Sequence, residues 1–287
     1  MKLYSIEAGN FKLDGGAMFS VVPKSLWEKT NPADKNNLIE MSSRCLLIED
    51  GKRLILIDTG LGDKQNARFF SRYALWGEYS LDSSLKKAGF HRDDITDVFL
   101  THLHFDHCGG AISRSRTGAL VPSFKNAVFW IHRSHWEWAT KPNQRESASF
   151  LKENIIPIKD SGQLKFIDGT KYFLDKTPLP FSIILVDGHT EKQMLPVIKI
   201  NRKTIIFAGD LIPTIGHLPI PYIMSYDTRP LLTLKEKKLF LEDAVLNETL
   251  LFMEHDPFHE LISLKTTDKG VRMNTHYKLS SYFSNKH

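Results

Sequence analysis

The feature that most constrains this chain is a short run of metal-binding residue types directly after an apolar segment. Residues 95–100 read ITDVFL, which favours a buried strand, and residues 101–110 read THLHFDHCGG. His102 and His104 stand two positions apart, so an extended backbone points both imidazoles to one side. Asp106 and His107 follow after the chain turns and can face a second metal ion close by. Since imidazoles and carboxylates are common zinc ligands, the pattern predicts a metal-binding loop at the carboxyl end of a buried strand.

Further apolar segments also end in residues that can bind a metal ion. Residues 183–188 (IILVDG) precede His189, residues 204–209 (TIIFAG) precede Asp210, and residues 250–254 (LLFME) precede His255. Upstream, residues 54–57 (LILI) precede Asp58. A lone histidine pair is usually incidental, but this combined pattern is hard to obtain by chance.

This arrangement resembles the signature of the metallo-β-lactamase-fold superfamily, over nearly the whole chain. The resemblance implies an α/β protein, an αβ/βα sandwich of two mixed β-sheets flanked by helices, with residues 1–287 as a single domain. It also implies two bound zinc ions, although manganese, cobalt and iron suit nitrogen and oxygen ligands too. The implied ligands are His102, His104 and His189 for one ion, Asp106, His107 and His255 for the other, and Asp210 as the bridge. Asp58 would steady the metal loop through a ligand's second ring nitrogen.

Two metal ions held in this way would activate a bridging water, and the resulting hydroxide would attack an electrophilic carbon or phosphorus. Asp106 would pass a proton to the leaving group. The oxygen-reducing di-iron members of the superfamily carry an acidic residue where His104 stands here. The expected activity is therefore hydrolysis.

Four stretches resemble the branch of quorum-quenching lactonases and organophosphate hydrolases: residues 13–16, 57–60, 188–190 and 209–213. The expected small-molecule substrate is an N-acyl-homoserine lactone. Well-studied lactonases carry a tyrosine three residues after the bridging aspartate, where this chain has Pro213. Tyr222 or His217, further along the same loop, is the expected replacement. The residues expected to line an acyl-chain pocket are Met18, Phe19, Trp27, Ile215, Leu218, Ile220 and Tyr222.

The same ligands are compatible with other activities. The alternatives are phosphotriester hydrolysis, β-lactamase-type amide hydrolysis and glyoxalase-type thioester hydrolysis; a non-catalytic metal-binding protein is a further one. The nucleases of the superfamily carry a large extra domain, for which 287 residues leave no room. The net charge of +5 comes without a run of like charges, so no nucleic-acid partner is predicted.

Residues 61–80 form a long aromatic and basic segment that is too apolar for a free loop. We expect it to cover the active site or to pack against a second subunit in a homodimer. The cysteines, Cys45 and Cys108, do not suggest a disulfide framework, and Cys108 is expected to be a small buried residue. Because the first ten residues lack an apolar core of signal-peptide length and no stretch approaches a membrane span, a cytoplasmic protein without a membrane partner is expected.

The remaining pattern gives local expectations. Asp50 and Gly51 predict a hairpin between residues 44–49 and 53–58. Helices are predicted over residues 81–89, 134–139, 146–154 and 234–246, and strands over residues 127–132 and 164–167. His132 and His135 are expected to be structural, because the sequence offers no third ligand near them.

Overall fold

The chain divides into two units, each with its own dense internal contacts. The computed structural model describes residues 1–284. The first unit consists of residues 1–10, 43–170 and 192–194, and the second consists of residues 11–42, 171–191 and those from 195 onward. Both units combine strands and helices, which confirms the predicted α/β class. The assignment of residues 1–287 to a single domain stays a prediction.

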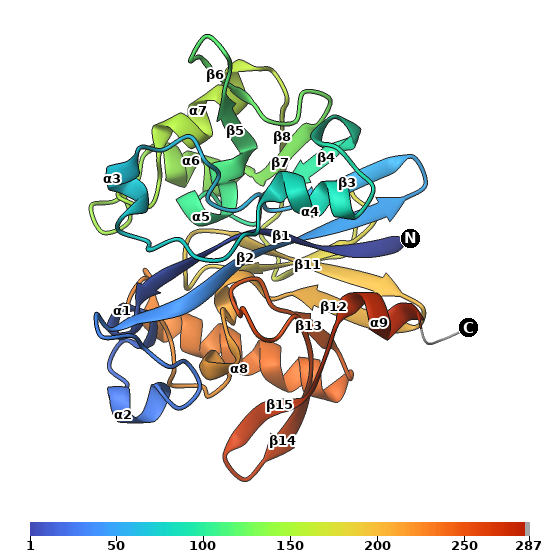
Figure 1. The fold of residues 1–287 in the computed structure, drawn as a ribbon. Coiled ribbons are helices and arrows are strands. Elements are labelled where there is room, and N and C mark those ends of the chain that lie inside the picture. Colours follow the sequence, from blue (N-terminus) through green and yellow to red (C-terminus); the bar gives the residue numbers. More distant parts are fainter. Residues whose placement is uncertain (285–287) are drawn as a thin grey trace. The chain divides into compact units, whose positions relative to one another are not determined.

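A six-stranded sheet organises the first unit, with strand order β1-β2-β3-β4-β7-β8 (Figure 1). Its strands are β1 (Lys2–Asp14), β2 (Leu38–Asp50), β3 (Arg53–Ile57), β4 (Asp97–Phe99), β7 (Val128–His132) and β8 (Leu164–Ile167). β2 and β3 form the predicted antiparallel hairpin, in which Gly51 takes a left-handed φ of 61°. β3, β4, β7 and β8 run parallel, so the residues that follow β3 and β4 emerge at one edge of the sheet.

Short helices and a small hairpin complete the first unit. They are α3 (Ala67–Phe70), α4 (Leu81–Lys87), α5 (Phe105–Cys108), α6 (Arg133–Thr140), α7 (Lys152–Asp160), the 3₁₀ turns η1 (Arg92–Asp94) and η2 (Gly109–Ala111), and the strands β5 (Ile112–Arg114) and β6 (Leu120–Pro122). The helices predicted over residues 81–89 and 134–139 are confirmed. The helix predicted over residues 146–154 is wrong in position, because Glu146 lies in a turn where Asn143 Oδ1 accepts from the backbone N–H groups of Arg145 and Glu146.

A seven-stranded mixed sheet organises the second unit, with strand order β15-β14-β13-β12-β11-β10-β9. Its strands are β9 (Phe173–Leu174), β10 (Ser182–Val186), β11 (Gln193–Ile200), β12 (Lys203–Phe207), β13 (Leu250–Phe252), β14 (Leu261–Thr267) and β15 (Gly270–Tyr277). β12 and β13 are parallel, with Ile206 opposite Leu251. The chain after both strands therefore emerges at the same edge of the sheet.

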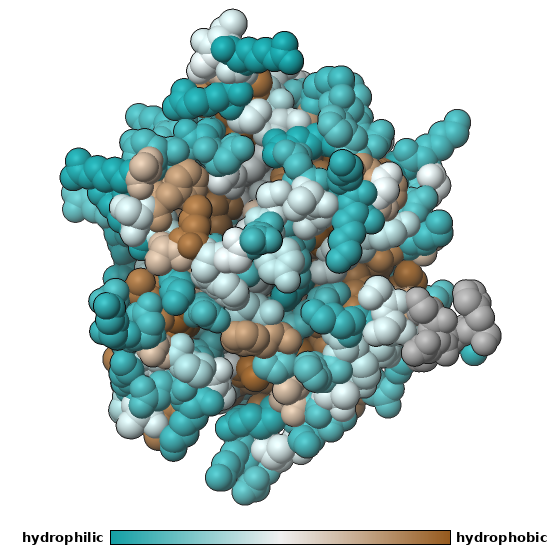
Figure 2. Space-filling model, viewed as in Figure 1, coloured by the Kyte–Doolittle hydropathy of each residue, from teal (hydrophilic) through white to brown (hydrophobic). Residues whose placement is uncertain are grey.

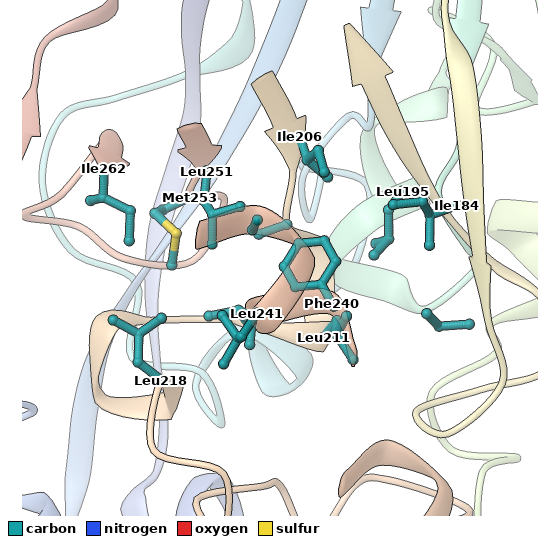
Figure 3. Packing of buried hydrophobic residues seen from close by; sticks show 14 of the residues in the cluster. Ile184, Leu195, Ile206, Leu211, Leu218, Phe240, Leu241, Leu251, Met253 and Ile262 are labelled. Carbon is teal, nitrogen blue, oxygen red and sulfur yellow. The ribbon is translucent and has the colours of Figure 1, made fainter. Parts of the chain in front are cut away.

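The long helix α8 (Pro230–Leu246) supplies much of the core of the second unit. Phe240 and Leu241 lie in one cluster with Leu195 and Leu251 of the sheet (Figure 3). Phe240 and Leu241 are 1% and 0% exposed, and burying such a side chain is worth roughly 1.5–3 kcal/mol. The other helical segments of the described second unit are α1 (Gly15–Phe19), α2 (Lys24–Trp27), η3 (Gly209–Leu211), η4 (Ile215–His217) and α9 (Leu279–Ser284). Across residues 1–284, no helix has the length and apolarity that crossing a membrane requires.

Candidate metal centre

The run of metal-binding residue types lies where the sequence predicts, directly after β4. His102 and His104 are 0% and 5% exposed, and His102 Nε2 lies 3.1 Å from His104 Nδ1. The chain then turns into α5, which carries Asp106 and His107. His107 Nε2 lies 3.9 Å from Asp106 Oδ1. Within the first unit, two pairs of candidate ligand atoms are therefore assembled by one loop and one turn of helix.

Asp58 supports this loop as expected. One of its carboxylate oxygens accepts from the Thr101 backbone N–H at 2.8 Å, and the other accepts from the Thr101 hydroxyl at 2.7 Å. The second oxygen also lies 3.0 Å from His107 Nδ1. This contact places the proton of His107 on Nδ1 and turns Nε2 towards Asp106. Asp58 has a left-handed φ of 58°, which is uncommon for a residue other than glycine.

Glu146 is a partner that the sequence pattern does not reveal. Its Oε1 lies 3.0 Å from His104 Nε2, and its Oε2 accepts from Trp138 Nε1 at 2.7 Å and from Asn143 Nδ2 at 3.1 Å. Glu146 is 2% exposed. This carboxylate fixes the ring of His104 so that Nδ1 faces His102.

The second unit contains a triangle of His189, Asp210 and His255, which follow β10, β12 and β13. Asp210 Oδ2 lies 3.0 Å from His189 Nε2, and Asp210 Oδ1 lies 2.9 Å from His255 Nε2. All three side chains are buried. The carboxylate therefore presents one oxygen beside each histidine, which is the arrangement that a carboxylate shared by two metal ions needs.

The second ring nitrogen of each histidine in this triangle also has a partner. His189 Nδ1 lies 2.9 Å from Asp227 Oδ1, and His255 Nδ1 lies 2.8 Å from the Ser42 carbonyl oxygen. Burial disfavours a charged His189, but Asp210 and Asp227 outweigh burial and raise the pKa of His189 to about 10. A metal ion at Nε2 would therefore displace a proton from His189.

Sequence comparison identifies the family. Residues 38–255 match the sequence model described as the metallo-beta-lactamase superfamily. The chain belongs to the metallo-β-lactamase superfamily. Solved structures show the same fold. A "probable metal-dependent hydrolase" from Staphylococcus aureus superposes with a TM-score of 0.85 at 24% identity, over 96% of this chain and 95% of that chain. AidC, a dizinc quorum-quenching lactonase, superposes with a TM-score of 0.77 at 24% identity, over 96% and 94% of the two chains. The predicted metallo-β-lactamase fold is confirmed.

A sequence relative gives a narrower comparison within the metallo-β-lactamase superfamily. An N-acyl homoserine lactonase from Bacillus cereus is 30% identical over 166 residues, which are 54% of this chain and 56% of that lactonase. The chain thus spans about half the length of the curated relative it matches.

His132, His135 and Cys108 lie near the metal loop and form hydrogen bonds with backbone groups. His135 Nε2 accepts from the Leu103 backbone N–H at 2.9 Å, and His132 Nε2 lies 2.8 Å from the Gly169 carbonyl oxygen. Within residues 1–284, neither histidine belongs to a candidate metal group. The Cys108 thiol donates to the Leu103 carbonyl at 3.3 Å, and burial raises its pKa to about 12. Cys108 is a small buried residue, as expected.

The loop after Asp210 corrects part of the sequence interpretation. The Nε2–H of His217 donates to the Met18 carbonyl at 2.8 Å, and Nδ1 lies 2.9 Å from the Thr214 hydroxyl. The ring stacks on Phe19 at 4.3 Å, and burial lowers the pKa of His217 to about 3. A histidine packed in this way supports the loop, so His217 is not carried forward as a catalytic residue.

The expected acyl-pocket residues separate into two groups. The first group is buried, with each side chain at most 2% exposed: Met18, Phe19, Trp27 and Leu218. Within this group the Phe19 ring stacks on Trp27 at 5.1 Å. Ile215, Ile220 and Tyr222 are partly exposed. Tyr222 meets Phe19 edge to face at 6.3 Å. Ile215 and Ile220 also pack in part against the core of the second unit, so the exposed surface of this second group is limited.

The aromatic segment of residues 61–80 contacts the metal loop within the first unit. Phe69 and Tyr73 lie 5.5 Å and 4.7 Å from the ring of Phe105, which stands between His104 and Asp106. Hydrophobic atoms are visible at the surface beside α3 (Figure 2). Leu75 and Tyr79 are 52% and 57% exposed. The predicted homodimer through this segment stays a prediction.

Proposed function

We propose that this protein is a two-metal hydrolase that opens the lactone ring of N-acyl-homoserine lactones. The observation that carries this proposal is the triangle in which Asp210 presents one oxygen to each of His189 and His255. Membership of the superfamily and the likeness to the Bacillus cereus lactonase support the choice of substrate.

The donor set fits zinc, because it consists of imidazole nitrogens and carboxylate oxygens. Each candidate histidine has one ring nitrogen held by a partner, which leaves the other nitrogen for a metal ion. In the proposed assignment, His102, His104 and His189 would hold one ion, Asp106, His107 and His255 would hold the other, and both ions would share Asp210. The assignment follows the family's ligand pattern.

Bound metal ions would supply an activated water and polarise the carbonyl group of the substrate. Asp106, at the start of α5, would hold the proton released from that water and return it to the alkoxide oxygen that leaves the lactone ring. The Tyr222 hydroxyl would donate to the substrate's carbonyl oxygen, in place of the tyrosine whose position Pro213 occupies. Ile215 and Ile220 would contact the acyl chain.

A substrate screen tests this proposal. Zinc-loaded protein is assayed with butanoyl- and decanoyl-homoserine lactone, a phosphotriester and a β-lactam. We expect both lactones to open, with a KM for the decanoyl lactone at least about tenfold lower, because burying only two more CH₂ groups suffices for that ratio. Tyr222→Phe should lower the rate of lactone opening. Rapid cleavage of the phosphotriester or the β-lactam with no lactone opening would show that the substrate proposal is wrong.

A further inference from the structure

Lys237 is a buried cation with an unusual set of partners. It projects from α8 and is 0% exposed, close in sequence to the core residues Phe240 and Leu241 (Figure 3). Its Nζ donates to the carbonyl oxygens of Tyr222 at 2.7 Å, Pro219 at 2.8 Å and Ile220 at 3.4 Å. All three acceptors lie within one four-residue stretch, residues 219–222, which we call the proline loop.

This arrangement carries a cost that a simple core position would avoid. Burial lowers the pKa of Lys237 to about 7, with Asp227 opposing and Arg272 reinforcing the effect. An apolar side chain would fill the same helix position without the desolvation of an ammonium group. An ammonium group has three N–H donors and no acceptor, and here three carbonyl oxygens face it. The donors and acceptors therefore match in number, which a buried ammonium group needs.

Besides Lys237, the proline loop is held by the packing of Ile220 against the core of the second unit and by few backbone hydrogen bonds. Pro219 and Pro221 have no N–H to donate. Its residues accept two backbone bonds, from Tyr222 N–H to Pro219 at 2.9 Å and from Ile223 N–H to Pro221 at 3.1 Å. Just after the loop, Ser225 N–H donates to the Ala17 carbonyl at 2.8 Å. Further along the chain, Thr228 N–H donates to the carbonyl of His189 at 3.0 Å. Lys237 thus holds residues 219–222, whereas Thr228, six residues later, is held beside the candidate ligand His189.

We propose that Lys237 is a positioning residue that gathers the carbonyls of the proline loop. It thereby sets the place of Ile220 against the acyl chain of the substrate and the place of the Tyr222 hydroxyl against the substrate's carbonyl oxygen. The proposal rests on the proposed function for its substrate. Within residues 1–284, the hydrogen bonds of Lys237 go to the loop and not to a candidate ligand. Its charge acts on the metal centre only through Asp227, the partner of His189, so zinc content is measured beside KM.

The test compares Lys237→Met with the matched control Lys238→Met. Lys238 is the next residue of α8, its side chain is 63% exposed, and it pairs only loosely with Glu242 at 4.0 Å. For Lys237→Met we expect a KM for decanoyl-homoserine lactone about ten- to a hundredfold higher, as the loss of hydrogen bonds to a charged group predicts. Its zinc content should match that of the wild type, and its kcat should fall no further than that of Tyr222→Phe, because the Tyr222 hydroxyl is displaced and not removed. The KM for butanoyl-homoserine lactone should rise less, because a short chain reaches less of the loop.

Hydrogen exchange gives a readout that needs no substrate. Peptides covering residues 218–226 should exchange faster in Lys237→Met than in Lys238→Met, while peptides covering β12 and β13 stay unchanged. Lys237→Gln, which keeps a long polar side chain with two donors, should be intermediate and remains informative if Lys237→Met does not fold. Equal exchange of residues 218–226 in all these variants, together with an unchanged KM, would overturn the proposal. If the wild type opens no lactone, the proposed substrate fails while the exchange data still decide whether Lys237 holds the loop.

Discussion

Replacing Glu146 by glutamine isolates the support that this carboxylate gives to His104. Trp138 Nε1 and Asn143 Nδ2 donate to Oε2, and His104 Nε2 faces Oε1. With a metal ion on Nδ1, His104 carries its proton on Nε2, so three donors meet two acceptor oxygens. Glutamine has nearly the same shape but only one oxygen, and its amide N–H₂ would face at least one of these donors.

The expected magnitude follows from this count. One buried donor without an acceptor lowers the free energy of unfolding by about 1–3 kcal/mol. Removing the partner that orients a ligand histidine typically lowers metal affinity about 10–100-fold, which corresponds to about 1.4–2.7 kcal/mol. We therefore expect Glu146→Gln to fold, to be less stable, and to bind zinc about 10–100-fold more weakly.

The assay is zinc competition against a chelating dye, with urea unfolding of the metal-free proteins measured in parallel. Glu137→Gln is the control, because Glu137 is exposed on the neighbouring helix α6. Cobalt-substituted protein should also show a changed visible spectrum, which a purely structural role for Glu146 would leave unaltered. The reasoning is refuted if Glu146→Gln is folded and binds zinc within about twofold of the control.

Three other predictions address the triangle, the loop and the surface. Asp210→Asn should keep the fold and lose activity by more than about 100-fold, since a loss of about 10–100-fold is typical of residues that only support a ligand. Activity and zinc content are measured together, and activity near that of the wild type would exclude a bridging role. Burial lowers the pKa of His217 from 6.5 to about 3, so its contribution to stability is present above pH 6.5 and is lost as the pH falls towards 3. Urea unfolding of chelator-treated protein should therefore show the wild type losing about 1–2 kcal/mol more than His217→Gln between pH 6.5 and 5, whereas parallel pH profiles would contradict the burial argument. If the aromatic segment forms a dimer interface, Leu75→Asp and Tyr79→Asp should convert a dimer to a monomer in analytical ultracentrifugation, and an unchanged sedimentation coefficient would remove this segment from the interface.

The sequence predicts the parts of this protein whose physical cause is local. An apolar run followed by a ligand residue predicted the ends of β4, β10, β12 and β13, because a buried strand and the polar loop after it are adjacent in sequence. The hairpin at Gly51 was predictable for the same reason, since a tight turn demands a residue tolerant of positive φ.

The partners of the ligands were not predictable in this way. Glu146 and Asp227 each contact a histidine about 40 positions distant, and no local pattern distinguishes them from other acidic residues. The pattern of charges along the helix predicts an exposed side chain for Lys237. In the structure it is buried, because its ammonium group binds the carbonyl oxygens of the proline loop. The apolar loop residues were recognised as buried, but their side chains divide between packing and surface in a way that depends on tertiary contacts.

The two ligand clusters differ in when they can form during folding. The candidate ligands between His102 and His107 are neighbours in sequence, so bringing them together closes only very short loops. His189, Asp210 and His255 follow three different strands, so their triangle exists only after β12 has paired with β13. Because metal binding to a cluster requires its ligands to be assembled, refolding in the presence of a zinc-sensitive dye should show early, weak metal uptake followed by a later, tight phase that coincides with sheet formation. Uptake in one phase would mean that the first cluster also waits for the sheet.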